Sequence, residues 1–314
     1  MKKMLFLVNP KAGKGAIRND LLDIVLIFSN AGYEVILYPT KDSADAERKI
    51  KEDGDCFDII VCAGGDGTLD NVVRGYFAKG LDVPLGYIPV GTTNDFARTI
   101  KLSRKPTEAA RQIVNGKVNK FDVGKFCDKN FIYIAAFGLF TDVSYNTNQS
   151  LKKVLGHSAY LVEAVKNITN YKGFYINAEF DGSSVSGEYI FGMITNSYSV
   201  AGFRIRGAKH VVLDDGKFDC LLVKKPSTVI EFQMVATAFL TNNFFDNEMF
   251  YMCKASKVSI KSTEAIAWTI DGEYGGSYEE IQIDNIEKAI GILVDTGSDY
   301  DDIDYKDIYD SIEE

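Results

Sequence analysis

Histidine, cysteine and proline are scarce in this chain of 314 residues, which contains two, five and six of them. Neither His157 nor His210 stands in a metal-binding spacing such as His-Glu-x-x-His, so a zinc site built on histidine is not expected. A Ser-His-Asp triad would need one of the two, and the Gly-x-Ser-x-Gly elbow is missing. The cysteines are scattered without a Cys-x-x-Cys pair, which indicates free thiols in a reducing compartment.

Long apolar runs are also missing. The opening stretch MKKMLFLVNPKAGKG has an apolar run of about six residues, which is too short for a signal peptide. No stretch approaches the roughly 20 apolar residues that cross a bilayer. We therefore expect an uncleaved cytoplasmic protein.

The net charge of −9 is concentrated at one end of the chain. Residues 295–314, DTGSDYDDIDYKDIYDSIEE, contain nine acidic residues and one lysine, so the preceding body is nearly neutral. Such a block is typical of a solvated, partly disordered tail. A basic stripe is missing and the tail would repel phosphates, so no nucleic acid partner is expected.

The first 120 residues alternate between strand-like and helix-like segments. Apolar runs predict strands, and apolar residues at helical spacing predict helices between them. Because these strands are apolar throughout, they indicate a parallel sheet covered by helices on both faces. The strands are expected at 4–9, 33–38, 57–65 and 83–91, and the helices at 16–32, 42–54 and 68–80.

The pattern changes after residues 120–130. Short β-rich runs separated by Gly, Asp and Ser follow, as in an antiparallel sandwich or barrel, with one long helical segment at 150–171. We therefore predict an α/β domain over residues 1–125, a mainly antiparallel β domain over 126–294 and an acidic tail over 295–314. A return of the last strand to the first domain is left open.

Three of the predicted strands end in loops rich in Gly, Thr or Asn, namely NPKAGKG (9–15), AGGDGT (63–68) and PVGTTNDF (89–96). Ligands of open parallel sheets bind at the carboxyl ends of the strands. Glycine lets backbone N–H groups approach a ligand, and a helix N-terminus adds partial positive charge, so the three loops predict a phosphate cradle. They match neither the Walker A loop, nor the dinucleotide fingerprint, nor the protein-kinase signatures.

Carboxylates stand within these loops and in two later turns. Asp66 and Asp95 would repel a phosphate unless a cation such as Mg²⁺ shares the site; the alternative is that both cap helices. In WTIDGEYGG (268–276), Asp271 and Glu273 flank a glycine after a strand, which suits a general base, a metal contact or a plain turn. Asp215 in LDDGKFD (213–219) could bind a hard cation, although a turn is the simpler interpretation.

Taken in order, NPKAGKG, GGDGTLDNVVRG, PVGTTNDFART, LDDGKFD and DGEYGG resemble the motifs of the bacterial soluble diacylglycerol kinases, over residues 3–294. Sphingosine kinases share the catalytic core of this lipid-kinase family. GGDGT alone also resembles NAD kinases and phosphofructokinases. An NAD kinase or another small-molecule kinase on the same fold is therefore the first alternative, and a non-catalytic nucleotide- or lipid-binding protein is the second.

The resemblance implies a Rossmann-like α/β domain followed by an antiparallel β-sandwich. It also implies a kinase that transfers the γ-phosphate of ATP to the hydroxyl of a lipid such as diacylglycerol, giving phosphatidic acid for phospholipid biosynthesis. The implied nucleotide-binding residues are Asn9, Pro10, Lys11, Ala12, Gly13, Thr40, Gly64, Gly65, Asp66, Gly67, Thr68, Leu69, Asp70, Thr92, Asn94 and Asp95.

The resemblance further assigns the acidic residues. An acidic network linked by Mg²⁺ would join Asp66, Asp95 and Asp122, and a structural Mg²⁺ would bind Asp215 together with the carbonyls of Val212 and Lys217. The general base would be Asp271 or Glu273, with Asp66 sharing that role in some accounts of the family.

Two departures from the family pattern concern these motifs. The family usually reads GGDGTLNE, where this chain has Asp70-Asn71, and it usually has a proline before the DDG turn that is missing here. The expected partner is a lipid substrate at the inner face of the membrane. Docking by charge alone would be weak for a nearly neutral body, and a homodimer is left open.

Overall fold

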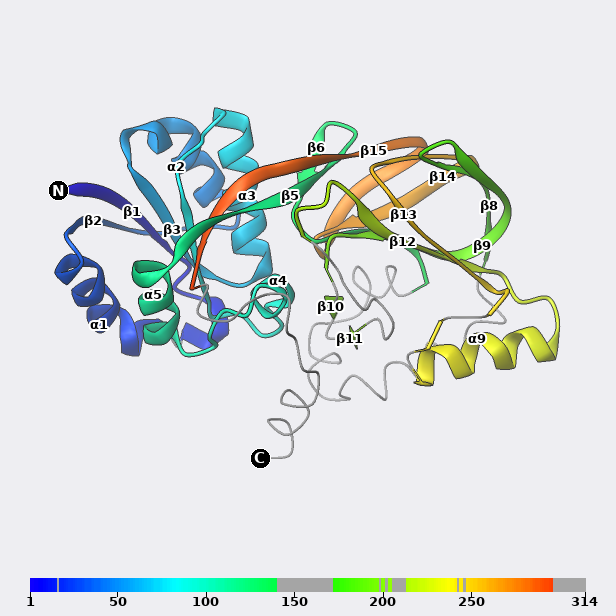
Figure 1. Ribbon diagram of the computed structural model, residues 1–314, viewed down its shortest axis with the longest axis horizontal. Coiled ribbons are helices and arrows are strands. Elements are labelled where there is room, and N and C mark those ends of the chain that lie inside the picture. Colours follow the sequence, from blue (N-terminus) through cyan, green and yellow to red (C-terminus); the bar gives the residue numbers. More distant parts are fainter. Residues whose placement is uncertain are drawn as a thin grey trace.

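The computed structural model describes residues 1–15, 17–139, 172–197, 199–200, 203–204, 213–241, 243–244 and 247–295. The helix predicted at 150–171 lies outside the described residues, as does the acidic tail after Asp295. Figure 1 shows two units side by side, one with strands between helices and one made mainly of strands.

Four apolar strands form the centre of the N-terminal unit. They run parallel in the order β2-β1-β3-β4 and comprise β1 (Lys2–Val8), β2 (Tyr33–Pro39), β3 (Ile59–Gly64) and β4 (Leu85–Pro89). Successive side chains of a strand point to opposite faces. Accordingly, Met4 and Phe6 of β1 belong to one apolar core, whereas Leu5 and Leu7 belong to another. Both faces of the sheet are therefore covered, as expected for apolar parallel strands.

The helices of this unit divide between the two faces. α1 (Ile17–Asn30) and α5 (Pro106–Asn115) pack on the face of Met4, and α2 (Asp45–Asp53) and α3 (Asp66–Lys79) pack on the face of Leu5. The short elements η1 (Ala12–Gly15), η2 (Gly54–Cys56) and α4 (Asp95–Thr99) complete the connections. The alternation of strands and helices predicted for the first 120 residues is therefore present.

Antiparallel strands make up most of the C-terminal unit. β8 pairs with both β9 and β14, and β7 pairs with the other ends of the same two strands, so the strands close around a core. Trp268 lies in this core, with its ring centroid 5.1 Å from that of Phe126 and 4.9 Å from that of Phe137. The strands are β6 (Lys129–Phe131), β7 (Ile134–Gly138), β8 (Phe174–Phe180), β9 (Ser183–Thr195), β10 (Ser199–Val200), β11 (Phe203–Arg204), β12 (Phe218–Lys224), β13 (Phe250–Ala255) and β14 (Lys257–Ile270).

Helix α9 (Val229–Thr241) lies at the far end of this unit in Figure 1. It begins with a capping box, in which the backbone N–H of Glu231 donates to Thr228 and the Glu231 carboxylate accepts from the N–H of Thr228. Among the described residues, no helix has both the length and the apolar character that a membrane span requires.

Two long strands join the units. β15 (Glu273–Val294) begins beside β14 and ends beside β4, to which it is parallel at Ile292 and Leu85. β5 (Lys117–Phe126) is antiparallel to β15, and Figure 1 shows both strands running from one unit to the other. Because β15 pairs with β14 at its start and with β5 and β4 at its end, it links the turn that opens it to the parallel sheet. The domain boundary at residues 125 and 126 stays a prediction.

Candidate active site

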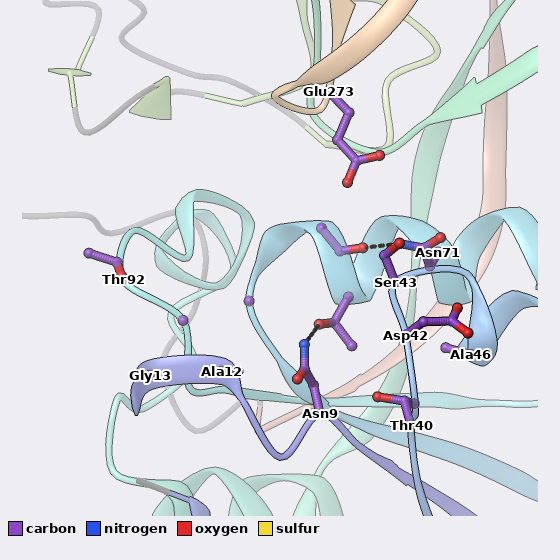
Figure 2. A pocket seen from close by; sticks show the side chains of 14 residues that line it. Asn9, Ala12, Gly13, Thr40, Asp42, Ser43, Ala46, Asn71, Thr92 and Glu273 are labelled. Atoms are coloured by element: carbon purple, nitrogen blue, oxygen red, sulfur yellow. Dashed lines mark hydrogen bonds between the residues drawn. The ribbon is translucent and has the colours of Figure 1, made fainter. Parts of the chain in front are cut away.

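A cavity of about 340 Å³ lies at the carboxyl ends of the parallel strands. The three glycine-containing loops and the loop after β2 form its wall, and Glu273 reaches it from the C-terminal unit, as Figure 2 shows. The loops predicted to converge therefore do share one cavity. The lining residues are Asn9, Ala12, Gly13, Thr40, Asp42, Ser43, Ala46, Gly65, Gly67, Thr68, Asn71, Gly91, Thr92 and Glu273.

Close packing explains two glycines of these loops. A Cβ on Gly64 would lie 2.3 Å from the Cβ of Thr68, and a Cβ on Gly91 would lie 2.5 Å from the Cα of Gly65. Thr68 Oγ1 in turn accepts a hydrogen bond from Asn9 Nδ2 at 3.1 Å, which Figure 2 draws. The first turn of α3, with its partial positive charge, is thereby held at the cavity wall.

Asp66 is the first residue of α3, and its pKa is raised to about 6. Burial is the largest cause, and the Asp95 carboxylate raises the pKa further, whereas backbone N–H groups of Asn94 and Phe96 lower it. Asp66 Oδ1 is buried and has no hydrogen-bond partner in the part of the chain that the structure describes. An unpartnered carboxylate oxygen beside a second carboxylate is an arrangement that a hard cation stabilises.

Asn94 keeps the loop after β4 in shape. Its backbone has a φ of 52°, in the left-handed region that Asn tolerates better than most residues. Asn94 Oδ1 accepts from Gly91 N at 3.0 Å, and Asn94 Nδ2 donates to Gly91 O at 2.9 Å. Asn94 and the buried Asp95 therefore support the loop from behind, whereas Gly91 and Thr92 form the cavity surface.

The turn between β14 and β15 holds Asp271 tightly. The residue is 3% exposed, and its carboxylate accepts hydrogen bonds from three backbone N–H groups, those of Ile132 at 2.7 Å, Tyr133 at 3.1 Å and Ile134 at 3.0 Å. Burial raises the pKa of Asp271 to about 7 even though these donors act to lower it. Asp271 has a φ of 48°, so the buried carboxylate also anchors a left-handed turn.

Glu273, two residues later, faces the cavity instead. Its side chain is 49% exposed, and a Cβ on Gly67 would lie 3.3 Å from Glu273 Oε1. The carboxylate therefore stands directly over the start of α3, as the close-up in Figure 2 shows. The two units meet here with a half-exposed carboxylate on one side and glycine loops on the other.

Comparisons with known proteins identify the family. Residues 3–126 match the diacylglycerol kinase catalytic domain, and residues 134–285 match the YegS C-terminal NAD kinase beta sandwich-like domain. The diacylglycerol kinase of Bacillus subtilis (strain 168) is 34% identical over 278 residues, which cover 88% of this chain and 91% of that protein. The chain belongs to the diacylglycerol kinase family. The resemblance seen in the motifs is thereby confirmed.

Further members of the diacylglycerol kinase family agree with this assignment. The diacylglycerol kinase of Staphylococcus aureus (strain bovine RF122 / ET3-1) is 33% identical and covers 93% of this chain and 92% of its own. A solved structure of a candidate diacylglycerol kinase from Bacillus anthracis str. Sterne is 28% identical, with a TM-score of 0.79 over 94% of this chain and 95% of that one. The chain is thus a kinase with an alcohol group as acceptor, and its two-part architecture with a strand-rich C-terminal region is that of the family.

The nucleotide-binding residues implied by the family fall into two groups. Those at the cavity surface are Asn9, Ala12, Gly13, Thr40, Gly65, Gly67, Thr68 and Thr92. Those outside its lining are Pro10, Lys11, Gly64, Asp66, Leu69, Asp70, Asn94 and Asp95. Of these, Leu69 belongs to the apolar core, and the backbone N–H of Lys11 donates to Asn9 Oδ1 at 3.0 Å. Nucleotide contact by either group stays a prediction.

The structure groups Asp122 with the Asp215 turn. Asp122 is 0% exposed; its Oδ2 accepts from Gly216 N and its Oδ1 from Lys288 N, each at 2.8 Å. The Asp122 carboxylate therefore braces β5 against β15 and the turn, since both of its oxygens bind backbone N–H groups there. A link from Asp122 to Asp66 and Asp95 stays a prediction.

Asp215 already has partners of its own. Its carboxylate accepts from Lys217 N at 3.0 Å and forms an ion pair with Lys254 Nζ at 3.2 Å. Val212 lies outside the described residues. Within the described ranges, no group of three or more His, Cys, Asp or Glu is placed to hold a metal. A structural Mg²⁺ would have to share the Asp215 carboxylate with the Lys254 ammonium, and it stays a prediction of the family resemblance.

Sequence reasoning assigned only Thr40 of the loop after β2 to the site, and it did not assign Asn71 of α3 to it. Asp42 and Ser43 line the cavity, and so does Asn71, whose Nδ2 donates to Gly67 O at 2.6 Å. The rule that selected the other loops, the carboxyl end of a parallel strand, applies equally to the loop after β2. That loop contains no glycine, so its composition alone does not mark it.

Proposed function

We propose that this protein transfers the γ-phosphate of ATP to the hydroxyl of a diacylglycerol, giving phosphatidic acid. Its membership of the family supports this proposal, and one observation carries it. The Glu273 carboxylate, from the C-terminal unit, stands over Gly67 in a cavity walled by glycine loops. Phosphoryl transfer depends on positioning and on neutralising charge, and this arrangement brings a phosphate cradle and a base together.

Nucleotide binding is proposed along the parallel-sheet side of the cavity. The first turn of α3 offers a helix N-terminus, which suits the phosphates, and Gly91 and Thr92 line the same cavity. The 3.1 Å hydrogen bond from Asn9 to Thr68 ties the loop after β1 to the first turn of α3. Thr40 and Ser43, on the loop after β2, contribute polar groups to the same cavity.

Mg²⁺ is proposed to accompany ATP at Asp66. The unpartnered Asp66 Oδ1 and the adjacent Asp95 carboxylate fit this ion, which favours one or two carboxylates together with phosphate oxygens and water. When bound, Mg²⁺ offsets negative charge on the β- and γ-phosphates. Two carboxylates suffice for that arrangement, in keeping with the lack of a larger ligand cluster among the described residues.

Glu273 is proposed as the general base, with Asp271 as its anchor. A base must reach the proton it removes, and Glu273 is half-exposed in the cavity wall, whereas both oxygens of Asp271 bind backbone N–H groups. In the step, the lipid hydroxyl oxygen bonds to the γ-phosphorus, its proton passes to Glu273, and the bond to the bridging oxygen of ADP breaks.

The place of the reaction follows from the acceptor. Because diacylglycerol resides in membranes, we propose that the protein works in the cytoplasm at the inner face of the membrane. We further propose that the parallel sheet is a Rossmann-like nucleotide-binding domain and the antiparallel unit a β-sandwich, in line with the strand pairing of each.

A transfer assay tests this function. The protein is incubated with γ-labelled ATP and Mg²⁺ and with mixed micelles that contain diacylglycerol, ceramide or a sphingoid base; NAD is the acceptor in a parallel reaction. We expect label in phosphatidic acid. Label in NADP and not in lipid would show a nucleotide acceptor. ATP binding without transfer to any acceptor would favour a binding protein.

A further inference from the structure

Arg74 lies on α3, one turn after Asp70. Asp70 is one of the two positions at which the GGDGT motif departs from the usual family pattern. Asp70 is 2% exposed, and its Oδ2 is 2.7 Å from Arg74 Nη2. An acid four residues before a base on one helix is the favourable orientation for such a pair. Burial and the nearby Asp271 carboxylate both raise the pKa of Asp70, and Arg74 acts against them.

The same guanidinium reaches across to the C-terminal unit. Arg74 Nη2 lies 3.2 Å from Glu273 Oε2, a pair separated by 199 positions in the chain. Arg74 Nη2 also donates to Asn71 Oδ1 at 3.3 Å, and Arg74 Nε lies 3.9 Å from Glu47 Oε2 on α2. One cation therefore stands between a buried acid of α3 and the carboxylate proposed as base.

The contact with Arg74 decides which carboxylate oxygen of Glu273 is available to accept a proton. Arg74 engages Oε2, while Oε1 lies against Gly67 at the start of α3. A planar guanidinium with fixed donors restrains a carboxylate more closely than an ammonium does. Without Arg74, Glu273 would be a half-exposed side chain free to change rotamer, and Asp70 would be a buried acid without its cation.

We propose that Arg74 is a positioning residue that holds Glu273 Oε1 toward the acceptor hydroxyl and compensates the buried Asp70. The assignment rests on the proposed function for its catalytic part, but the contact between Arg74 and Glu273 does not. Asp70 and Arg74 form one unit, in which the acid keeps the guanidinium in place and the guanidinium keeps the base in place.

Variants of Arg74 test the catalytic part. Arg74→Gln should lower kcat for lipid phosphorylation by about ten- to a hundredfold, the scale of a misplaced catalytic group, with the Kd for ATP within about twofold. The acid limb of the kcat/KM profile should move to higher pH, because loss of a cation raises the pKa of nearby carboxylates. Arg74→Lys should keep the limb in place and recover part of kcat.

Two further variants separate positioning from folding. Arg74→Gln combined with Glu273→Gln should be no slower than Glu273→Gln alone, because Arg74 acts through that carboxylate. Lys79→Gln, on the last turn of α3 and ion-paired with Asp55 at 3.1 Å, is the matched control and should keep the wild-type rate and profile. Wild-type kcat and pH profile in Arg74→Gln would overturn the catalytic part.

Unfolding measurements test the contact whatever the acceptor proves to be. We expect Arg74→Gln and Glu273→Gln together to lower the denaturation midpoint by less than the sum of the single changes. Strict additivity would show that the two side chains do not interact and would overturn the inference. A wild-type protein that phosphorylates no lipid, with non-additive midpoints, would instead contradict the proposed function and leave the Arg74 contact standing.

Discussion

Replacing Asp66 by Asn should change how stability depends on pH. The pKa of Asp66 is about 6 in the folded protein, against an ordinary value of 3.8 that the unfolded chain is expected to have. Between these values the folded state holds a proton that the unfolded chain has lost, so this group favours folding below about pH 4. Its contribution is lost as the pH rises through about 6.

The magnitude follows from the size of the shift. A shift of about two units corresponds to a ceiling of about 3 kcal/mol, since each unit is worth about 1.4 kcal/mol. Asn does not titrate, so from about pH 4 to pH 7 the wild type should lose up to about 3 kcal/mol relative to Asp66→Asn. The measured figure should fall below this ceiling, because Asp66 is partly exposed and solvent screens its charge.

Urea unfolding at several pH values between those limits measures this difference. Far-ultraviolet circular dichroism is a suitable probe, because most of the described helices belong to the N-terminal unit. Asp23→Asn, at an exposed position of α1, is the control and should run parallel to the wild type. A difference between Asp66→Asn and wild type that stays constant with pH would refute the account of a buried, titrating Asp66.

A second arm of the same experiment adds Mg²⁺ at neutral pH. A ligand that binds only the folded state raises its stability. If Asp66 holds the ion, Mg²⁺ should stabilise the wild type more than Asp66→Asn. Equal stabilisation of both proteins would move the metal away from Asp66.

Substitutions at three further positions probe the frame of the site. Gly64→Ala places a Cβ 2.3 Å from Thr68 Cβ, so the free energy of unfolding should fall by about 1–3 kcal/mol. The Kd for ATP, measured by titration calorimetry, should rise. Unchanged values of both would contradict the close contact. Asn94→Ala and Asn94→Gly both remove the two hydrogen bonds to Gly91, but only alanine is strained at a φ of 52°. The glycine variant should therefore unfold at a higher denaturant concentration than the alanine variant. The reverse order would exclude backbone strain at this position. Asp271→Asn turns an amide NH₂ toward a backbone N–H and should cost about 1–3 kcal/mol of stability, while a wild-type denaturation midpoint would show that the turn does not depend on the carboxylate.

Local sequence patterns predicted the N-terminal unit well because its signals are local. Apolar runs such as FDIIVCAGG give a buried strand, and the spacing of Leu69, Val72 and Val73 gives the buried face of α3. The glycine loops that follow these strands must lie at one edge of the parallel sheet, so their convergence could be predicted. Residues of all three loops line one cavity, which confirms this convergence.

Contacts between distant parts of the chain could not be read in this way. The pairing of Arg74 with Glu273 depends on how β15 places its first residue over α3, which no local pattern encodes. Likewise, Asp122 binds the N–H of Lys288, where the register between β5 and β15 shifts, and the N–H of Gly216, which is 94 positions away in the chain. Asp70 was visible as a departure from the family, and Arg74 stands four residues later on the same predicted helix, but the contact of Arg74 with Glu273 became clear only in the folded chain.

Glu273→Gln gives the most direct test of the central claim that a carboxylate from the C-terminal unit completes a nucleotide site on the parallel sheet. The change keeps the size of the side chain and removes its basicity. We predict that transfer of label from ATP to diacylglycerol falls at least about 100-fold, the scale of losing a general base, while the Kd for ATP stays within about twofold. A variant that phosphorylates diacylglycerol at the wild-type rate would contradict the account.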